Sequence, residues 1–481
     1  MQETRHYLAG GWRDSDHHRD NINPSDTRDC LGAFAQADAA LLDEAVAAAV
    51  AAQPVWAAMP LEQRQAALQA IGDRLQADAD ALGTLLAREE GKPFAEARGE
   101  VFRAGQFFQY YAAECLRLIG ENADSVRPGV EIDVRREPIG VVGVISPWNF
   151  PLATASWKIA PALAYGNSVV WKPASLTPAS ALALAQIVDA VGLPPGVFNV
   201  LLGSGSALGD AMATHPDVAA ISFTGSVAVG QALAVRAITT MKRIQLEMGS
   251  KNPLVVLDDA DLDLAVAHAV QSAFGGTGQK CTAASRLIVH TRVHDAFVER
   301  LVAATEALQV GHALAPDTRI GPVVSAEQLD ANLAAIATGI AEGAQLCCGG
   351  ERLTRDTPGY FMAPAVFSET DNAMTINRNE LFAPITCVLR ADDYAHALAI
   401  ANDTPFGLVA GIMTRSLAHA THFRRHARAG CISVNLPTAG TDYHVPFGGR
   451  GISSYGPREQ GKHAREFYTV TKTAYIAAGE V

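Results

Sequence analysis

The sequence predicts an α/β protein built from two parallel-sheet units and a small extension of exposed strands. Three observations lead to this prediction. The chain has 481 residues. That is about three times the usual size of one domain. Short apolar strands alternate with helical stretches from 140 to 225, and a second alternating block runs from 252 to 435. Because parallel strands need long crossover connections, this alternation is typical of sheets covered by helices on both faces.

The segment before residue 120 is predicted to be mainly helical. Apolar residues recur at helical spacing from Leu41 to Leu86, where Met59-Pro60 separates two expected helices. A third helix is expected from Ala95 to Ile119. This helix carries the aromatic residues Phe107, Phe108, Tyr110 and Tyr111. Packing between helices is the favoured interpretation of that cluster, and the wall of a substrate channel is the alternative.

Two segments alternate apolar and polar residues as half-exposed strands do. They are VEIDVRREP (Val130 to Pro138) and EFYTVTKTAYI (Glu466 to Ile476). Exposed strands offer unpaired backbone groups, so we expect these two to pair, either within the chain or across a subunit boundary.

The first parallel-sheet unit is predicted from four apolar strands at 140–146, 167–173, 197–203 and 218–225, with helices at 179–191 and 207–213. The second unit begins at NPLVVLD (252–258), continues through a helix to about Phe274, and ends near CISVN (431–435). The boundary between the units is therefore expected near residue 250. Ligands of such sheets bind outside the carboxyl ends of the strands, so the side chains at those ends are the first candidates for function.

Composition limits the class of partner. Lys and Arg total 38 and Asp and Glu total 50, which leaves a net charge of −12. This acidic balance excludes a nucleic acid or an anionic membrane surface as the main partner, since both select basic patches. The chain is 49% hydrophobic and 18% charged, which is enough apolar material for a large core.

The sequence also suggests a compartment. The N-terminal segment MQETRHYLAGGW has no apolar core, and no uninterrupted apolar stretch is long enough for a membrane helix. The seven cysteines are scattered, without CxxC spacing. We therefore expect a reducing, cytoplasmic environment rather than a disulfide framework.

Polar residues follow the strands of the first unit. Asn149 in ISPWNFP follows the first strand, where its amide can donate to a developing oxyanion, although Asn is also a common turn residue. Lys172 and Ser175 in KPASLTP follow the second strand, where dinucleotide folds read a ribose. A solvated lysine at a strand end is the alternative. FTGSVAVG (Phe223 to Gly230) opens a helix whose N–H groups could face a pyrophosphate, but it does not match GxGxxG.

Two residues, one just before the second unit and one within it, could carry covalent chemistry. Glu247 in LEMGSKNP precedes a Gly-Ser turn, and Cys281 in GQKC lies in a glycine-rich loop after a helix. A single cysteine is more often buried and inert than catalytic, so its position alone does not assign a role.

Several acidic and histidine clusters resemble metal sites but are better explained otherwise. Asp259 to Asp263 resembles a calcium loop, yet Leu264 stands where the sharp turn needs glycine, so a helix N-terminus is the preferred interpretation. His422 and His426 have no third ligand nearby in sequence, and the pair His290 and His294 lacks one too. No metal is expected.

Taken together, seven motifs occur in one order: PWNFP, WKP, FTGS, LEMGSKNP, GQKC, ELFAP and PFGG. In this order and spacing, the chain resembles the NAD(P)-dependent aldehyde dehydrogenase superfamily from about Leu8 to its end. The resemblance implies a Rossmann-like cofactor domain (1–120 and 139–248) and an α/β catalytic domain that carries the nucleophile (249–440). It also implies oligomerisation strands at 121–138 and 463–481, and hence a homodimer or homotetramer.

The resemblance implies a role for each matching residue. Cys281 would be the nucleophile that forms a thiohemiacetal and then a thioester, and Glu247 the base that activates the hydrolytic water. Asn149 and the backbone N–H of Cys281 would bind the oxyanion. NAD or NADP would be bound by Ser146, Pro147, Trp148, Lys172, Ser175, Gly225, Ser226, Glu380 and Phe382. Trp157 and Phe447 would line the substrate tunnel.

The chain departs from the family pattern at the cofactor site. Many NAD-preferring members have Glu where this chain has Ser175. A carboxylate there would repel a 2′-phosphate, so its absence predicts that NADP is well tolerated. Ser250 and Ala383 replace residues that are usually glycine, and we expect little consequence.

The substrate is the least defined prediction. The tail from Tyr443 to Ile476 resembles a subgroup that contains 2-oxoglutarate semialdehyde (2,5-dioxopentanoate) dehydrogenases. However, Trp157 stands where succinate-semialdehyde dehydrogenases have an arginine for the substrate carboxylate. Neutral or aromatic aldehydes are therefore an alternative, unless another cation binds the carboxylate. A CoA-acylating enzyme is disfavoured because Glu247 is retained, and a binding protein without turnover because the whole catalytic set is present.

Overall fold

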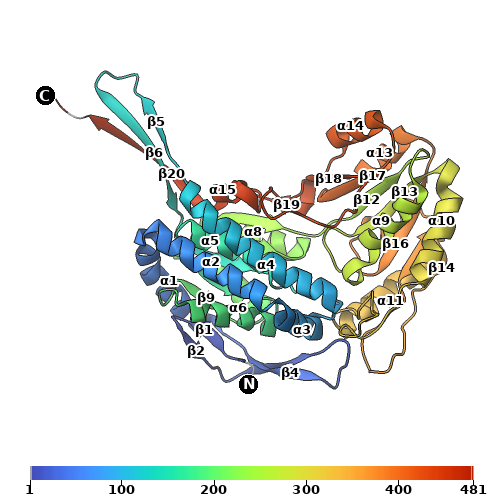
Figure 1. The fold of residues 1–481 in the computed structure, drawn as a ribbon, viewed down its shortest axis with the longest axis horizontal. Coiled ribbons are helices and arrows are strands. Elements are labelled where there is room, and N and C mark those ends of the chain that lie inside the picture. The colour runs from blue at the N-terminus through green and yellow to red at the C-terminus, as the bar shows by residue number, and fades with distance from the viewer. Residues whose placement is uncertain (1–2, 478, 480–481) are drawn as a thin grey trace.

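The computed structural model describes residues 3–477 and 479 and forms two α/β units beside each other, with a narrow arm that extends away from the first unit (Figure 1). The predicted α/β class is confirmed. The first unit carries most of the chain before residue 250, and the second carries the segment from 252 to 434.

The first unit is built on an eight-stranded sheet whose central strands β7 to β11 run parallel. In spatial order its strands are β19 (Ser454–Tyr455), β11 (Arg243–Glu247), β10 (Ala220–Thr224), β7 (Val141–Ile145), β8 (Ser168–Lys172), β9 (Phe198–Val200), β1 (His6–Leu8) and β2 (Gly11–Arg13). The order reverses between β7 and β10, which is the switch point where such sheets bind ligands. The predicted four strands are present. The strand β11, which ends at Glu247, was not predicted.

Helices cover both faces of this sheet. The helices are α1 (Ala39–Ala58), α2 (Leu61–Ala77), α3 (Ala79–Glu90), α4 (Phe94–Glu114), α5 (Ala153–Ala164), α6 (Pro178–Val191), α7 (Asp210–Thr214) and α8 (Val227–Ile238). Apolar residues of α1, α7 and α8 pack with Val141 and Ile145 of β7, whereas α5 and α6 pack with Val142 and Val144, which point to the opposite face. The helices α2, α3 and α4 form a further layer over α5 and α6.

The helix prediction needs correction at four places. Three helices, not two, occupy residues 39–90, because only Asp78 separates α2 from α3. The third predicted helix is α4, which ends at Glu114 rather than Ile119. The helix expected at 207–213 is a π-turn (Gly205–Gly209) followed by the short α7. Helix α5 was missed, since all of its residues are buried and show no amphipathic pattern.

The second unit has a seven-stranded sheet in which all neighbours are parallel except β14 and β15. Its strands in spatial order are β14 (Gln345–Cys348), β15 (Ala365–Ser368), β16 (Ile385–Ala391), β13 (Ala284–His290), β12 (Asn252–Val256), β17 (Val409–Met413) and β18 (Cys431–Val434). The helices of this part are α9 (Leu262–Phe274), α10 (Thr291–Glu306), α11 (Ala326–Ala341), α12 (Thr375–Arg378), α13 (Tyr394–Asn402) and α14 (Leu417–His426). The segment 441–462, which the predicted division leaves unassigned, returns to the first sheet as β19.

The arm contains β5 (Glu121–Asp124), β6 (Val130–Pro138) and β20 (Thr469–Ala477), which follows the short helix α15 (Arg465–Tyr468). The two predicted exposed strands pair with each other within one chain, antiparallel from Thr469 opposite Pro138 to Ala477 opposite Val130. The second strand begins at Thr469 rather than at the predicted Glu466, because residues 466–468 belong to α15. A separate hairpin of β3 (His18–Ile22) and β4 (Cys30–Ala35) lies near the N-terminus.

Helix α1 is the one helix in the described part of the chain that is long and apolar enough to cross a membrane. Its residues Leu42, Ala45, Val46 and Ala49 are buried against the first sheet, and Trp56 is buried in the neighbouring core cluster. Packing inside the fold therefore explains one face of this helix, whereas Val50 and Val55 are exposed.

Candidate active site

A cavity of about 550 Å³ lies where the two units meet. The first unit contributes the residues after β7, β10 and β11, and the second contributes the loops around Cys281 and Glu380. The predicted site residues in its wall are Pro147, Trp148, Asn149, Trp157, Gly225, Ser226, Glu247, Cys281, Glu380, Phe382 and Phe447. Segments far apart in sequence are therefore brought together around one cavity.

Asn149 is held from two sides. Its side-chain Nδ2 donates to the carbonyl of Gln279 at 2.9 Å, and its own carbonyl accepts from Lys92 Nζ at 2.5 Å. Lys92 is buried and paired with Glu100 at 2.6 Å. An Asn amide has two N–H donors. Only one of them is bonded to a residue that the structure describes, which leaves the other for a group in the cavity.

Cys281 follows a tight turn, Gly275–Gly278, in which three consecutive residues have left-handed backbone. Gly278 has φ 67°, and a Cβ there would lie 2.1 Å from the carbonyl oxygen of Ala383, so only glycine fits. Asn252 Nδ2 donates to the Cys281 carbonyl at 2.7 Å. Burial, assisted by the Glu380 and Glu247 carboxyls, raises the pKa of the Cys281 thiol to about 12.

Glu247 is the last residue of β11 and lies opposite Ser454 of β19. Its Oε2 accepts from Ser454 Oγ at 2.6 Å. Burial raises the pKa of Glu247 to about 8, although the hydrogen bond from Ser454 opposes this shift. The carboxyl therefore changes protonation near neutral pH, which is the range that a general base requires.

Glu380 and Phe382 lie on the opposite wall. Glu380 Oε1 accepts from the Ser250 N–H at 2.8 Å, and burial raises the pKa of Glu380 to about 7. A Cβ at Gly249 would lie 1.9 Å from Glu380 Oε2, so a larger residue there would displace this carboxyl. Phe382 has a left-handed backbone with φ 55°, and its ring contacts Trp148 edge-on at 5.5 Å.

Lys172 and Ser175 lie together beyond the main cavity, after β8. Lys172 Nζ and Ser175 Oγ donate to the same carbonyl, that of Gly203, at 3.3 and 3.0 Å. Burial lowers the pKa of Lys172 to about 8. No carboxylate of the described chain is paired with Lys172, so this buried amine retains donors for a ribose hydroxyl or a phosphate oxygen. Ser146 is buried, and its Oγ accepts from Trp171 Nε1 at 2.8 Å.

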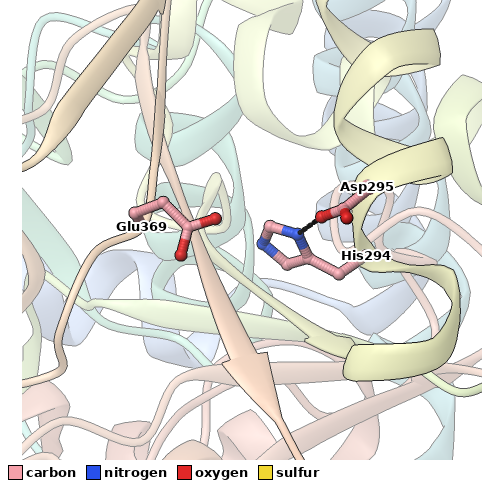
Figure 2. A group of neighbouring side chains, drawn as sticks. All are labelled: His294, Asp295 and Glu369. Carbon is pink, nitrogen blue, oxygen red and sulfur yellow. Dashed lines mark hydrogen bonds and ion pairs between the residues drawn. The ribbon is translucent and has the colours of Figure 1, made fainter.

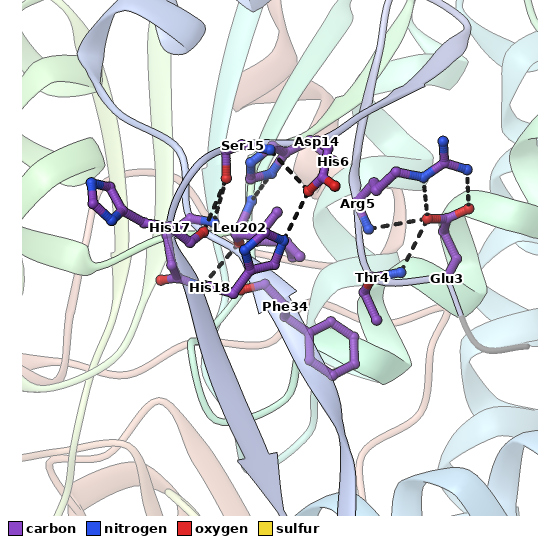
Figure 3. A network of polar contacts seen from close by, with 12 residues as sticks. Glu3, Thr4, Arg5, His6, Asp14, Ser15, His17, His18, Phe34 and Leu202 are labelled. Atoms are coloured by element: carbon purple, nitrogen blue, oxygen red, sulfur yellow. Dashed lines mark hydrogen bonds and ion pairs between the residues drawn. The ribbon is translucent and has the colours of Figure 1, made fainter.

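Lys172 and Ser175 both donate to the carbonyl of Gly203. The residue before it, Leu202, is held by His6 of the N-terminal strand β1. His6 Nδ1 accepts from the N–H of Leu202 at 3.1 Å, within a polar network formed by the N-terminal segment (Figure 3). Burial lowers the pKa of His6 to about 4, so the ring stays neutral and keeps accepting this hydrogen bond. Sequence patterns did not identify His6, because one histidine in a short strand carries no motif.

The other end of the cavity is aromatic. Trp157 contacts Phe107 edge-on at 5.9 Å and Phe447 at 5.5 Å. The cluster on α4 therefore divides: Phe107 lines the cavity, whereas Phe108 and Tyr111 are buried in the core. The favoured interpretation as helix packing is thus incomplete, since the channel-wall alternative holds for Phe107.

The cavity wall also contains residues that sequence reasoning missed. They include Arg103, Gln271, Lys280 and Thr441. Arg103 lies one helical turn before Phe107, so the i, i+4 spacing on α4 was a signal that could have placed it on the same face.

The residues set aside as metal decoys are explained by other contacts. Asp261 caps helix α9 by accepting from the Leu264 N–H at 3.2 Å, which confirms a helix N-terminus. His294, Asp295 and Glu369 come close together (Figure 2). Arg390 Nη2 contacts Asp295 at 2.7 Å and Glu369 at 2.6 Å, so the two carboxylates are compensated by a guanidinium in an ion-pair cluster.

Comparison with known proteins gives a consistent picture. The family model described as "Aldehyde dehydrogenase family" matches residues 12–474. The alpha-ketoglutaric semialdehyde dehydrogenase of Bacillus subtilis (strain 168) is 39% identical over 456 residues, covering 94% of this chain and 93% of that protein. The alpha-ketoglutarate semialdehyde dehydrogenase of Haloferax volcanii is 39% identical over 478 residues, 98% of each chain.

Solved structures with the same fold include betaine aldehyde dehydrogenase from Staphylococcus aureus in complex with NAD+. It superimposes with a TM-score of 0.97 at 32% identity, covering 100% of this chain and 96% of that one. An aldehyde dehydrogenase described as putative, from Burkholderia cenocepacia, gives a TM-score of 0.96 at 37% identity, covering 100% and 99%.

Proposed function

The chain belongs to the aldehyde dehydrogenase family, and from this premise we propose that it oxidises a semialdehyde such as 2,5-dioxopentanoate with NAD or NADP. The enzyme class itself, an oxidoreductase acting on the aldehyde group of donors through a cysteine, follows from family membership. The observation that supports the detailed proposal is the single cavity that contains Cys281, Asn149, Glu247 and Glu380.

Cys281 is the proposed nucleophile. Once its thiol has given its proton to water, the sulfur bonds to the aldehyde carbon, and the carbonyl oxygen becomes an oxyanion. The free N–H of Asn149 and the backbone N–H of Cys281 are the proposed donors to that oxyanion. Because Gln279 holds the Asn149 amide, the donor is oriented before the substrate arrives.

The nicotinamide cofactor supplies an acceptor for the hydride that leaves the former aldehyde carbon. Loss of this hydride leaves a thioester on Cys281. Glu247 is the proposed base that takes a proton from water, whose oxygen then bonds to the thioester carbon. The carbon–sulfur bond breaks, which releases the carboxylic acid and regenerates the thiolate.

The residues present fit a dinucleotide. Lys172 is a buried amine bonded only to a carbonyl among the described residues, and Glu380 is a half-buried carboxyl with one backbone partner. We assign Lys172 and Ser175 to the adenosine ribose and Glu380 to the nicotinamide ribose. Position 175 carries no carboxylate. A 2′-phosphate would therefore meet no repulsion there, which supports the use of NADP.

The semialdehyde is favoured because two relatives at 39% identity over nearly the whole chain are alpha-ketoglutarate semialdehyde dehydrogenases. A neutral or aromatic aldehyde is the second candidate, supported by the aromatic wall of Phe107, Trp157 and Phe447. Transfer of the acyl group to CoA is less consistent with the retained base, Glu247.

A rate panel tests the substrate. Initial rates are measured with succinate, glutarate and 2-oxoglutarate semialdehydes, and with benzaldehyde, propanal and glycolaldehyde, each with NAD and with NADP. The proposal requires the highest kcat/KM for 2-oxoglutarate semialdehyde. A higher value for benzaldehyde or propanal would contradict it and support the second candidate.

We further propose a homodimer or homotetramer assembled through the arm. Val470, Tyr475 and Ile476 of β20 are exposed apolar side chains on this projecting sheet, which is typical of a surface buried by another subunit. A monomer in sedimentation at micromolar concentration would contradict this. All seven cysteines are free, which supports a reducing cytoplasm as the proposed compartment.

A further inference from the structure

We infer that Arg103 binds the carboxylate of the substrate, which makes the enzyme specific for aldehydes with an acidic group at the far end. The inference rests on the proposed function, because it takes Cys281 as the point where the aldehyde reacts. It concerns a residue that no sequence motif marked.

Arg103 lies in the wall of the cavity that also contains Cys281. It belongs to helix α4, one turn before Phe107, and both residues line that cavity. Phe107 in turn contacts Trp157, so Arg103 adjoins the aromatic end rather than the wall formed by Glu380 and Phe382. A substrate that extends from Cys281 along the aromatic wall would bring its far end towards this helix.

The charge of Arg103 is uncompensated, unlike the other charges nearby. Glu96 on the same helix pairs with Lys280 at 3.0 Å, and Glu100 pairs with Lys92 at 2.6 Å. Within the described residues, Arg103 takes part in no salt bridge and no hydrogen bond. The Arg103 guanidinium is half-buried. Its N–H groups are therefore available to an anionic group of a ligand in the cavity.

Tyr443 orients the guanidinium. The guanidinium carbon of Arg103 lies 5.4 Å from the centre of the Tyr443 ring. Tyr443 is itself supported by ring contacts with Phe107 at 6.5 Å and Tyr110 at 5.9 Å. An arginine stacked on an aromatic ring keeps its in-plane N–H groups free, and these groups match the two oxygens of a carboxylate.

Arg103 also accounts for the conflict at Trp157. The neutral indole at that position argued for neutral aldehydes, because it stands where succinate-semialdehyde dehydrogenases have an arginine. In this chain the cation comes from α4 instead of α5, so an aromatic wall and an acidic substrate are compatible in one cavity.

The test compares charged and neutral aldehydes of similar shape. The kcat/KM is measured for succinate semialdehyde, for its methyl ester and for butanal, with the wild-type enzyme and with R103Q and R103K. The control R98Q removes a cation from the same helix outside the cavity, where Arg98 pairs with Asp80 on the surface. We expect R103Q to lower the ratio of charged to neutral kcat/KM by about 10- to 100-fold, mainly through KM. R103K, which keeps the charge without the planar fork, should give an intermediate ratio, and R98Q the wild-type ratio.

Equal losses for charged and neutral aldehydes in R103Q would overturn the inference, since Arg103 would then only shape the cavity. An unchanged ratio would overturn it as well. The rate panel tests the proposed substrate separately. If the wild-type enzyme has a higher kcat/KM for benzaldehyde or propanal, the proposal that 2-oxoglutarate semialdehyde is the substrate is wrong. The ratio of kcat/KM for succinate semialdehyde to kcat/KM for its methyl ester still decides whether Arg103 binds a carboxylate.

Discussion

The side-chain amide of Asn149 donates a 2.9 Å hydrogen bond to the carbonyl of Gln279, two residues before Cys281. This bond joins the segment after β7 in the first unit to the nucleophile loop of the second. The proposed oxyanion donor and the proposed nucleophile are therefore positioned relative to each other by one contact between units.

Replacement of Asn149 tests the oxyanion role. Asn149→Ala removes both the free donor and the bond to Gln279, so kcat/KM should fall by about 10²- to 10³-fold. The measurement is steady-state oxidation of the best aldehyde in the panel. The control is Asn122→Ala on β5, an exposed position in the arm. A loss for Asn149→Ala of less than threefold would contradict the role.

Replacement of Cys281 tests the nucleophile. Cys281→Ala should lower aldehyde oxidation at least about 10⁴-fold, because no bond to the substrate carbon can form. Cofactor binding, followed by quenching of protein fluorescence on titration with NADH, should persist. Cys348→Ala is the matched control, since Cys348 is another partly buried cysteine and lies on β14, outside the cavity wall. Turnover near the wild-type rate in Cys281→Ala would rule out the mechanism.

The role of Glu247 predicts a pH dependence. Burial raises the pKa of this carboxyl to about 8, and only the ionised form accepts a proton. Thioester hydrolysis should therefore be fastest above pH 8 and decline as the pH falls below it. Stopped-flow absorbance of the reduced cofactor would resolve the steps.

In Glu247→Gln the same experiment should show a burst of reduced cofactor followed by a steady rate about 10²- to 10⁴-fold lower. The acyl-enzyme that accumulates should be visible by mass spectrometry of the quenched protein. A steady rate close to that of wild type, without a burst, would count against Glu247 as the base.

Ser175 should control the discrimination between cofactors. Ser175→Glu places a carboxylate beside the proposed site of the adenosine ribose. It should weaken the binding of NADP about 10- to 100-fold more than the binding of NAD. Ser175→Gln has nearly the same size without the charge and is the control. Calorimetry gives the dissociation constants of both cofactors for each variant. If Ser175→Glu weakens the binding of NAD and NADP equally, the assignment of Ser175 to the adenosine ribose is refuted.

Local patterns were sufficient where one segment determines its own structure. The strands β7, β8 and β10 were predicted because they are short apolar runs bounded by turn residues. The same reasoning failed for α5, whose residues Ala153–Ala164 are all buried. A helix buried on every side has no polar face, so its sequence shows no helical periodicity.

By itself, the sequence determined the α/β class, the family and the candidates Cys281, Glu247 and Asn149, because these depend on strand periodicity and on motifs in a fixed order. Only the tertiary structure decided which other groups share their cavity. Arg103 and Tyr443 are far apart in the sequence, and no local pattern connects them, yet their side chains are in contact. Their contact arises because α4 and the loop that leads back to β19 pack against one cavity, and such long-range contacts are a property of the folded chain rather than of any local segment.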